Sequence, residues 1–395
     1  MKKWRVVAKI LFAVTALVSA AIFSEYIFDA LHYTNYKSDF SLTSKQAIER
    51  YGLYQLDNDK IYALKPNRNS VYEENQTDAQ GFRFQPHISH LAGLTTQIIT
   101  VGDSFTYGHG VPLGYAYPAV LETMLNTSST SAVVHNAGVS GFGPDQEFVY
   151  IKQLLRRQKI NVLVWNFNMN DLVDADEACL ITKIGNTYIQ EPGWLNSIYI
   201  HAIADKILPP ALLNSHIGNL LLYAPNILLH KTRVTLGCTG RFSPDQIISK
   251  IVYLIKTVHT LTKSRGILFI TTLVPYQYYF DSGLTNHNAA LQNYQQLRDA
   301  LTHTGSYFID TNAQIAKKYD APLARIRDEM TASNNPERKD VAGAHIDDLA
   351  HNLFLSDDTE FPYGWKHLNA LGNRYFAEVV SAAIFSGNNS PLPAR

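Results

Sequence analysis

The sequence is poor in cysteine and has no net charge, and each of these features excludes a class of protein. Cys179 and Cys238 are the only cysteines among 395 residues, which excludes a disulfide-stapled scaffold. Their pairing stays open, because two reduced buried cysteines would also suit a chain of this size. No Cys/His spacing resembles a metal site, so we expect no metal and no other cofactor. Lys plus Arg and Asp plus Glu number 34 each, so no net field favours nucleic acid as a partner.

Long apolar runs are rare, but one lies near the start of the chain. Lys2, Lys3 and Arg5 precede the uncharged run "ILFAVTALVSAAIF" from Ile10 to Phe23. This pattern predicts either a signal anchor, which would tie the chain to a membrane, or a signal peptide cleaved after small residues near 18–20. In both cases the positive leading end predicts that the bulk of the chain lies outside the cytoplasm. We expect inner-membrane anchoring with a periplasmic domain, or secretion.

The rest of the chain divides by its patterning. Residues 1–28 hold the apolar segment, and 29–95 form a polar and aromatic lead-in that we predict to be irregular. From 96 to 386 strand-like and helix-like segments alternate, which predicts one large domain. Two segments interrupt the alternation, at about 174–241 and 321–360, and we predict that these are insertions.

Five short apolar runs have the character of buried strands. They read "QIITVG", "AVVHNAG", "NVLVWNF", "GILFITTLV" and "SYFIDT", and segments with helical spacing lie between them. The helices have recognisable starts, at Pro144 and after Ser243. Because parallel strands need crossover connections, the pattern predicts an α/β fold with a parallel five-stranded sheet between two helical layers.

Residues able to perform acyl transfer follow these strands. Ser104 in "VGDSFTYGHGV" comes directly after the first strand, Gly141 in "NAGVSGFG" after the second, and Asn170 in "NFNMNDL" after the third. Ligands of such folds bind beyond the carboxyl ends of the strands. Backbone N–H groups of Ser104 and Gly141 and the Asn170 amide could stabilise an oxyanion there. His367 in "WKHLNALGN" could take the serine proton and return it to the leaving group.

With these four blocks in order, the sequence resembles the SGNH, or GDSL-type, serine hydrolase family. The blocks are "GDSF", "NAGVSG", "NMND" and "HLNALGN", and the resemblance spans about Gln97 to Val380 outside the two insertions. Together with "DAQGFR", it points to the exported bacterial branch that has membrane-anchored members. The resemblance implies a flavodoxin-like three-layer fold, catalysis by Ser104 and His367, and no metal.

Two positions depart from the family pattern. The third block has Asn168 where the family usually has glycine, which leaves the Asn170 amide in place. The acid that orients the histidine normally lies two or three residues before it, where this chain has Gly364 and Trp365. We predict that Asp358 takes this part through a folded loop, with Asp357 or a backbone carbonyl as alternatives. Without such a group the site would be a Ser-His dyad.

Other polar residues near these blocks have simpler interpretations. Asp103 is expected to brace the turn by accepting backbone N–H groups, and Asp171 to hold its own loop. His109 and His135 lie close in sequence, but most histidines have no catalytic part. Arg83 in "GFR" could pair with an acid near the sheet edge, and nothing in the sequence makes it catalytic.

Three functions are compatible with the pattern. The first is an exported serine esterase that forms an acyl-enzyme on Ser104, with an acylated small molecule, glycan or lipid as substrate. The second is an O-acetyltransferase or deacetylase of envelope or exported polysaccharide, because water and a sugar hydroxyl attack the same intermediate. The third is a non-catalytic binding protein with the same fold, suggested by the missing acid before His367.

Overall fold

The computed structural model describes eleven parts of the chain: residues 53–69, 76–85, 96–126, 131–178, 180–184, 187–193, 203, 243–280, 287–317, 353–355 and 366–386. The chain divides into two compact units. The smaller one comprises Met1–Tyr62 and Leu180–Thr239, and the larger one Ala63–Cys179 and Gly240–Arg395. Both cysteines lie outside the described residues, as does the apolar run of residues 10–23.

The strands outside the main sheet form two short pairs. Strands β1 (Tyr54–Asp57) and β2 (Ile61–Leu64) pair with each other, and so do β6 (Ile181–Ile184) and β7 (Thr187–Gln190), which run antiparallel. The first pair lies in the range 29–95, which the sequence pattern predicts to be irregular. Among the described residues, no helix is both long and apolar enough to cross a membrane.

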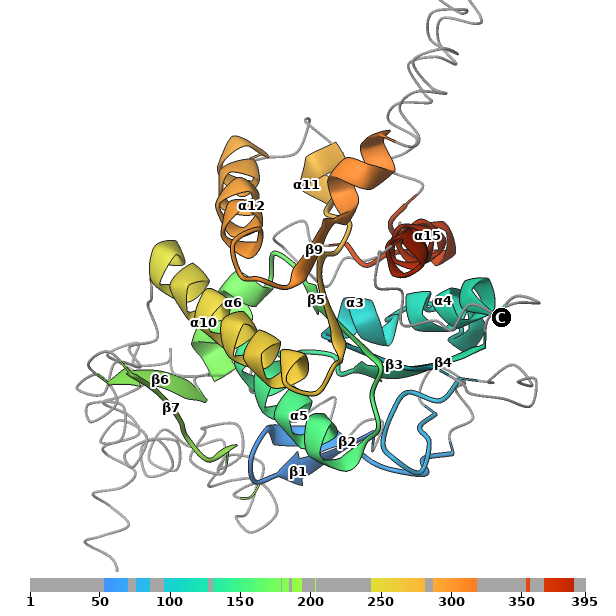
Figure 1. Ribbon diagram of the computed structural model, residues 1–395, viewed down its shortest axis with the longest axis horizontal. Coiled ribbons are helices and arrows are strands. Elements are labelled where there is room, and N and C mark those ends of the chain that lie inside the picture. Colours follow the sequence, from blue (N-terminus) through green and yellow to red (C-terminus); the bar gives the residue numbers. More distant parts are fainter. Residues whose placement is uncertain are drawn as a thin grey trace, which may run out of the picture. The chain divides into compact units, whose positions relative to one another are not determined.

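A five-stranded sheet forms the centre of the larger unit (Figure 1). Its strands are β3 (Thr96–Gly102), β4 (Ala132–Gly138), β5 (Val162–Phe167), β8 (Leu268–Leu273) and β9 (Tyr307–Asp310). All neighbouring pairs are parallel, in the order β4-β3-β5-β8-β9. This is the flavodoxin-like order, and it confirms the predicted fold class. The order reverses between β3 and β5, where such folds bind ligands.

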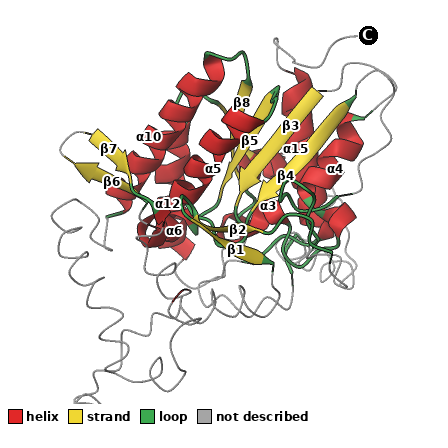
Figure 2. Cartoon of the chain, turned by 90° about the horizontal axis from the view of Figure 1, so that it is seen from below, coloured by secondary structure: helices red, strands yellow, loops and turns green. Residues whose placement is uncertain are grey.

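Helices cover both faces of the sheet (Figure 2). Helices α4 (Tyr117–Leu125) and α15 (Ala370–Ser386) pack together on one face, and α5 (Pro144–Arg157) and α10 (Pro244–Lys263) on the other. Three further helices, α6 (Asp171–Ala178), α11 (Gln277–Phe280) and α12 (His287–Leu301), follow β5 and β8. Every residue of β5 is buried, as a strand covered on both faces requires.

The helix starts agree with the sequence signals. Both α5 and α10 begin with a proline. Proline lacks a backbone N–H, and at the first position of a helix that N–H would have no acceptor within the helix. Ser243 caps α10, because its hydroxyl accepts a hydrogen bond from the N–H of Gln246 and the Gln246 side chain accepts from the N–H of Ser243.

One apolar core joins α4 and α15 to the sheet. Ile98, Val164 and Ile270 from three strands pack in the same cluster as Leu121 and Phe376 from the two helices, and all five are buried. Burying an aliphatic side chain contributes about 1.5–3 kcal/mol. This core therefore sets the position of α15, and with it the segment that precedes that helix.

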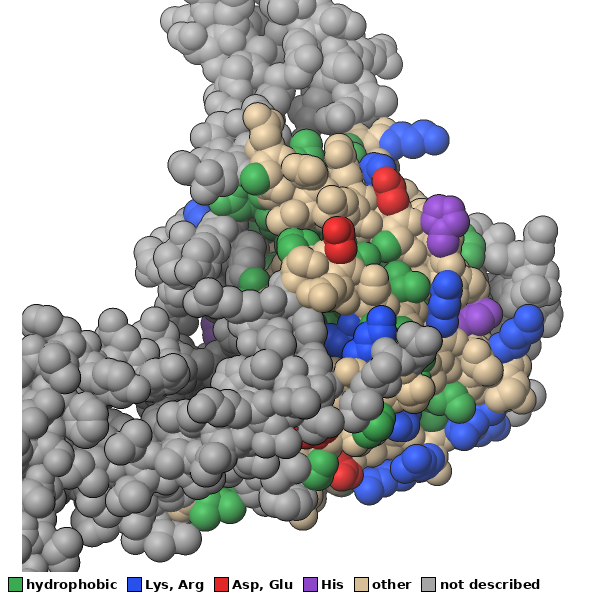
Figure 3. Space-filling view, turned by 90° about the vertical axis from the view of Figure 1, so that its left-hand side faces the viewer, with side chains coloured by type: hydrophobic (Ala, Val, Ile, Leu, Met, Phe, Trp, Pro, Cys, Tyr) green, Lys and Arg blue, Asp and Glu red, His purple; other side chains and the backbone are tan. Residues whose placement is uncertain are grey.

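Basic side chains are concentrated at two helix ends. Arg156 and Arg157 lie in the last turn of α5, and Lys263 in the last turn of α10. Arg265 joins the two ends, since its guanidinium donates to the carbonyl of Leu155. Figure 3 shows Lys and Arg side chains gathered in the lower right part of one face. Cations at helix C-termini complement the helix dipole. This explains the basic side chains there without invoking a bound anionic ligand.

Candidate active site

The predicted nucleophile lies in a short helical turn at the switch point of the sheet. Helix α3 (Ser104–Tyr107) follows β3 directly, and Asp103 caps it by accepting from the N–H of Phe105 at 2.9 Å. This confirms the bracing part predicted for Asp103. A Cβ on Gly138 would lie 2.2 Å from the backbone N of Tyr107, so only glycine lets the end of β4 approach this turn. Ser104 is 9% exposed and therefore sits in a closely packed site.

His367 lies beside Ser104, although 263 residues separate them. The serine Oγ is 2.7 Å from Nε2 of His367, within the range for a nucleophile and its base. The buried imidazole contacts the rings of Phe105 and His109, each with its centroid 4.8 Å away. Phe105 is buried and His109 is exposed.

Backbone pairing holds His367 in this place. The N–H of Leu355 donates to the carbonyl of His367 at 2.9 Å, and the N–H of Asn369 donates to the carbonyl of Leu353 at 3.0 Å. Residue Asn369 then caps α15, where its Oδ1 accepts from the N–H of Leu371 at 2.9 Å. The histidine is thus fixed between a short pairing and a capped helix.

Asn373 links α15 to α4. Its Oδ1 accepts from the N–H of Tyr117 at 3.0 Å, at the start of α4, and its Nδ2 donates to the carbonyl of Leu368 at 3.0 Å. The residue is 1% exposed. Because buried polar groups are costly to leave unpaired, this link keeps the two helices in register.

The three predicted oxyanion donors differ in whether they already make hydrogen bonds. The N–H groups of Ser104 and Gly141 make no hydrogen bond within the described parts of the chain. The Nδ2 of Asn170, by contrast, donates to Asp103 Oδ2 at 2.7 Å and to Asp174 Oδ2 at 3.0 Å. Both acceptors described for this amide are therefore carboxylate oxygens.

The remaining predicted residues divide into described and undescribed ones. Asp357 and Asp358 lie outside the described residues, so the acid that orients His367 stays a prediction. Asp171 Oδ2 accepts from the N–H of Asn168 at 2.7 Å, in agreement with a loop-holding part. The contacts described for the His135 ring are with Gln97 and Phe82. In the described ranges no three His, Cys, Asp or Glu side chains form a group that could hold a metal ion.

A buried polar network beneath the nucleophile turn was not predicted. Asn166, on the buried strand β5, donates to the hydroxyls of Thr106 at 2.9 Å and Tyr117 at 2.6 Å, and accepts from the hydroxyl of Thr272 at 2.9 Å. Burial raises the pKa of the Tyr117 phenol. An asparagine within an apolar strand was the available signal, because a buried amide needs several partners.

Arg83 also has a larger part than the sequence suggested. Its side chain is 2% exposed, and its guanidinium donates to the carbonyl oxygens of Tyr107, Gly108 (2.8 Å) and Val111 (2.7 Å). It also lies 4.7 Å from the centroid of the Tyr107 ring. Arg83 thus ties the end of the Ser104 turn to the loop that carries His109.

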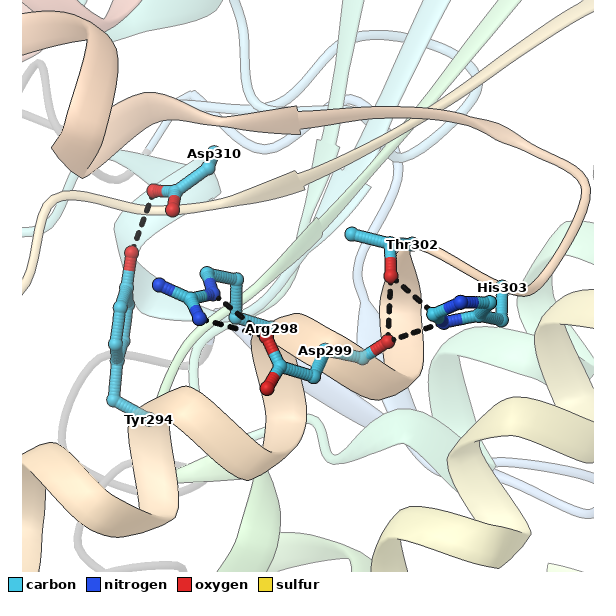
Figure 4. Close-up of polar contacts among 6 residues, drawn as sticks. All are labelled: Tyr294, Arg298, Asp299, Thr302, His303 and Asp310. Atoms are coloured by element: carbon cyan, nitrogen blue, oxygen red, sulfur yellow. Dashed lines mark hydrogen bonds and ion pairs between the residues drawn. The ribbon is translucent and has the colours of Figure 1, made fainter.

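We expect Arg83→Met to lower the free energy of unfolding by about 3 kcal/mol, because three carbonyls lose a charged donor. Arg83→Lys should recover only part of this, since an ammonium lacks the planar fork of donors. Urea unfolding measures both effects. Arg298 provides the matched control, because it forms an exposed ion pair with Asp299 at 2.7 Å (Figure 4). Arg298→Met should cost about 0.5 kcal/mol or less, and equal losses in the two methionine variants would contradict the part given to Arg83.

Three carboxyl groups lie buried next to the site. Asp103, Glu147 and Asp171 are at most 3% exposed. Glu147 Oε2 accepts from Trp165 Nε1 at 2.7 Å, whereas Glu147 Oε1 and Asp171 Oδ1 have no hydrogen-bond partner within the described residues. Burial, reinforced by the neighbouring carboxyls, raises the pKa of Glu147 and of Asp171 well above their usual values. Burial also raises the pKa of Asp103, against the hydrogen bond from Asn170.

The raised pKa of Glu147 predicts a pH-dependent effect on stability. The folded state binds this proton more tightly than the unfolded state, so the group costs stability as pH rises from its unfolded pKa through its folded one. Glu147→Gln removes that cost and keeps an acceptor for Trp165. We expect the stability gained by the variant over the native chain to grow as pH rises above the ordinary pKa of a glutamate, by about 1.4 kcal/mol for each unit by which the folded pKa is raised.

Unfolding in urea at several pH values would measure this gain. Glu378→Gln is the control, because Glu378 pairs with the exposed Arg374 on the surface of α15. A difference between Glu147→Gln and the native chain that stays constant with pH would contradict the prediction.

Known proteins similar to this chain come from solved structures. No protein-family model matches the chain, and no curated protein matches it significantly. Among solved structures it is similar to AlinE4, a SGNH-hydrolase family esterase, with 15% identity, a TM-score of 0.32, and coverage of 58% of this chain and 84% of that one. A member of the lipolytic protein G-D-S-L family from Veillonella parvula has 13% identity, a TM-score of 0.35, and coverage of 73% and 97%.

A third similar structure is a catalytic mutant of Axe2, an acetylxylan esterase from Geobacillus stearothermophilus. It has 12% identity and a TM-score of 0.33, with coverage of 73% of this chain and 94% of that one. At such low identities and TM-scores, the likeness carries no statement about what this chain does.

Proposed function

We propose that the chain is a serine ester hydrolase of the SGNH type that forms an acyl-enzyme on Ser104. The observation that supports this most directly is the 2.7 Å separation between Ser104 Oγ and His367 Nε2. A binding protein has no need for a serine hydroxyl paired with a buried imidazole at the switch point of the sheet. The pair has the geometry of an activated nucleophile and its base.

The proposed reaction has two steps. Ser104 Oγ attacks the ester carbonyl carbon while His367 Nε2 takes its proton. The tetrahedral oxyanion accepts hydrogen bonds from the N–H groups of Ser104 and Gly141 and from the amide of Asn170. Collapse breaks the ester bond, and the leaving alcohol takes the proton from His367. Water then attacks the acyl-enzyme with the same imidazole as base, which releases the acid and restores Ser104.

Purified chain mixed with an activated acetyl ester tests the proposal. A rapid burst of alcohol, followed by slower turnover, would report an acyl-enzyme. A fluorophosphonate should modify Ser104, which peptide mass spectrometry can locate. Turnover without modification of Ser104, or no turnover and no modification at all, would contradict the proposed mechanism.

We propose further that the chain acts outside the cytoplasm. The support is in the sequence alone: four basic residues precede the apolar run from Ile10 to Phe23. Fractionation of cells that express the full chain measures its location, and recovery in the cytoplasm would contradict this part without affecting the catalytic proposal.

A further inference from the structure

The amide of Asn170 already donates to two carboxylates in the resting protein. A side-chain amide carries two N–H donors, and those of Asn170 reach Asp103 Oδ2 at 2.7 Å and Asp174 Oδ2 at 3.0 Å. Exchanging the amide oxygen and nitrogen would direct the oxygen at two carboxylates, so this orientation is the favourable one. For Asn170 to stabilise an oxyanion, one carboxylate must release its hydrogen bond.

The two carboxylates differ in how firmly they are held. Asp103 is 3% exposed and also caps the Ser104 turn through the N–H of Phe105, so it cannot leave without disturbing the nucleophile. Asp174 is half-buried and lies one turn along α6, where its N–H donates to the carbonyl of Asn170 at 2.9 Å. A hydrogen bond closer to solvent exchanges more easily with water. Asp174 is therefore the carboxylate that releases its hydrogen bond from Asn170.

The backbone of Asp174 faces the loop that carries the second oxyanion donor. A Cβ on Gly143 would lie 2.6 Å from the carbonyl carbon of Asp174, which brings this loop, with Gly141, against α6. Asp174 thus contacts both the Asn170 amide and the loop that carries Gly141. A negative charge there opposes the charge that develops on an ester oxygen in the transition state.

We propose that the Asp174 carboxylate occupies one N–H of Asn170 in the resting protein and releases it when an ester carbonyl binds. The carboxylate therefore competes with the oxyanion for the same hydrogen. This inference rests on the proposed function, because it concerns the oxyanion site of that reaction.

Removal of Asp174 gives a direct test. We expect Asp174→Ala to raise kcat/KM for an activated acetyl ester about five-fold, because the transition state no longer displaces a charged acceptor. Asp174→Asn, which keeps an acceptor without the charge, should give a smaller rise. Asp299→Ala removes an exposed carboxylate that pairs with Arg298, and should leave kcat/KM unchanged.

Asn170→Ala separates the hydrogen bond from a general effect of charge. If Asp174 acts through the amide, the rise caused by Asp174→Ala should disappear when Asn170 is already alanine. A fall or no change with Asp174→Ala, or an equal rise in both backgrounds, would overturn the inference and leave the proposed function intact. Absence of Ser104-dependent turnover in the native chain and in Asp174→Ala would overturn the proposed function and the inference with it.

Discussion

Ser104→Ala is expected to abolish modification by a fluorophosphonate and to lower kcat for an activated acetyl ester by on the order of 10⁴-fold or more. The hydroxyl is the attacking group of the proposed reaction, and its Oγ is the atom that meets His367 Nε2 at 2.7 Å. Oxyanion donors and binding contacts would remain, so a small residual rate over water is expected. Steady-state kinetics and intact-protein mass spectrometry measure the two effects.

Ser264→Ala is the matched control for this variant. Ser264 lies on the exposed turn after α10, where its hydroxyl donates to the carbonyl of Leu261. It should keep native turnover and native modification. Turnover by Ser104→Ala within about ten-fold of the native rate would show that another group performs the reaction.

His367→Ala is expected to lower kcat by on the order of 10³- to 10⁵-fold, because the serine would lose the base that takes its proton. Modification of Ser104 by the fluorophosphonate should slow in parallel. Imidazole added to the solution should restore part of the activity, because the deleted ring leaves a space beside Phe105 and His109. Such rescue would not occur if the histidine only supported the fold.

His303→Ala controls for the loss of a histidine in general. His303 is exposed at the end of α12, where its ring contacts the hydroxyl of Thr302 and the carbonyl of Asp299 (Figure 4). It should leave kcat and the urea midpoint unchanged. Native rates in His367→Ala would contradict its part as the base, and a large fall in the urea midpoint without rescue by imidazole would show a structural part instead.

The main elements of the fold were accessible from local sequence signals. The run "NVLVWNF" became the fully buried strand β5, and the serine before Pro244 became a helix cap. These features depend on neighbours within a few residues, such as apolar side chains without a polar partner or a hydroxyl next to free N–H groups. The pairing of β1 with β2 was not predicted, because strands of four residues are too short to show a clear alternation of apolar and polar residues.

The candidate site could be predicted only in part from local sequence signals. Glu147 resembles an ordinary acid in the first turn of a helix, where carboxylates are common, yet it is fully buried. Arg83 resembled a partner for an acid, yet the hydrogen bonds described for its guanidinium end on carbonyl oxygens. In both cases the outcome depends on which surfaces pack against the side chain, which no local pattern records.

By itself, the sequence determined the alternation of strands and helices and the candidate residues Ser104, Gly141, Asn170 and His367. Only the tertiary structure decided that His367 meets Ser104, because that contact spans 263 residues and depends on the packing of α15 against α4. It also decided that the Asn170 amide donates to two carboxylates. Local propensity acts over one or two turns of chain, whereas a distance between remote atoms is set by the core that lies between them.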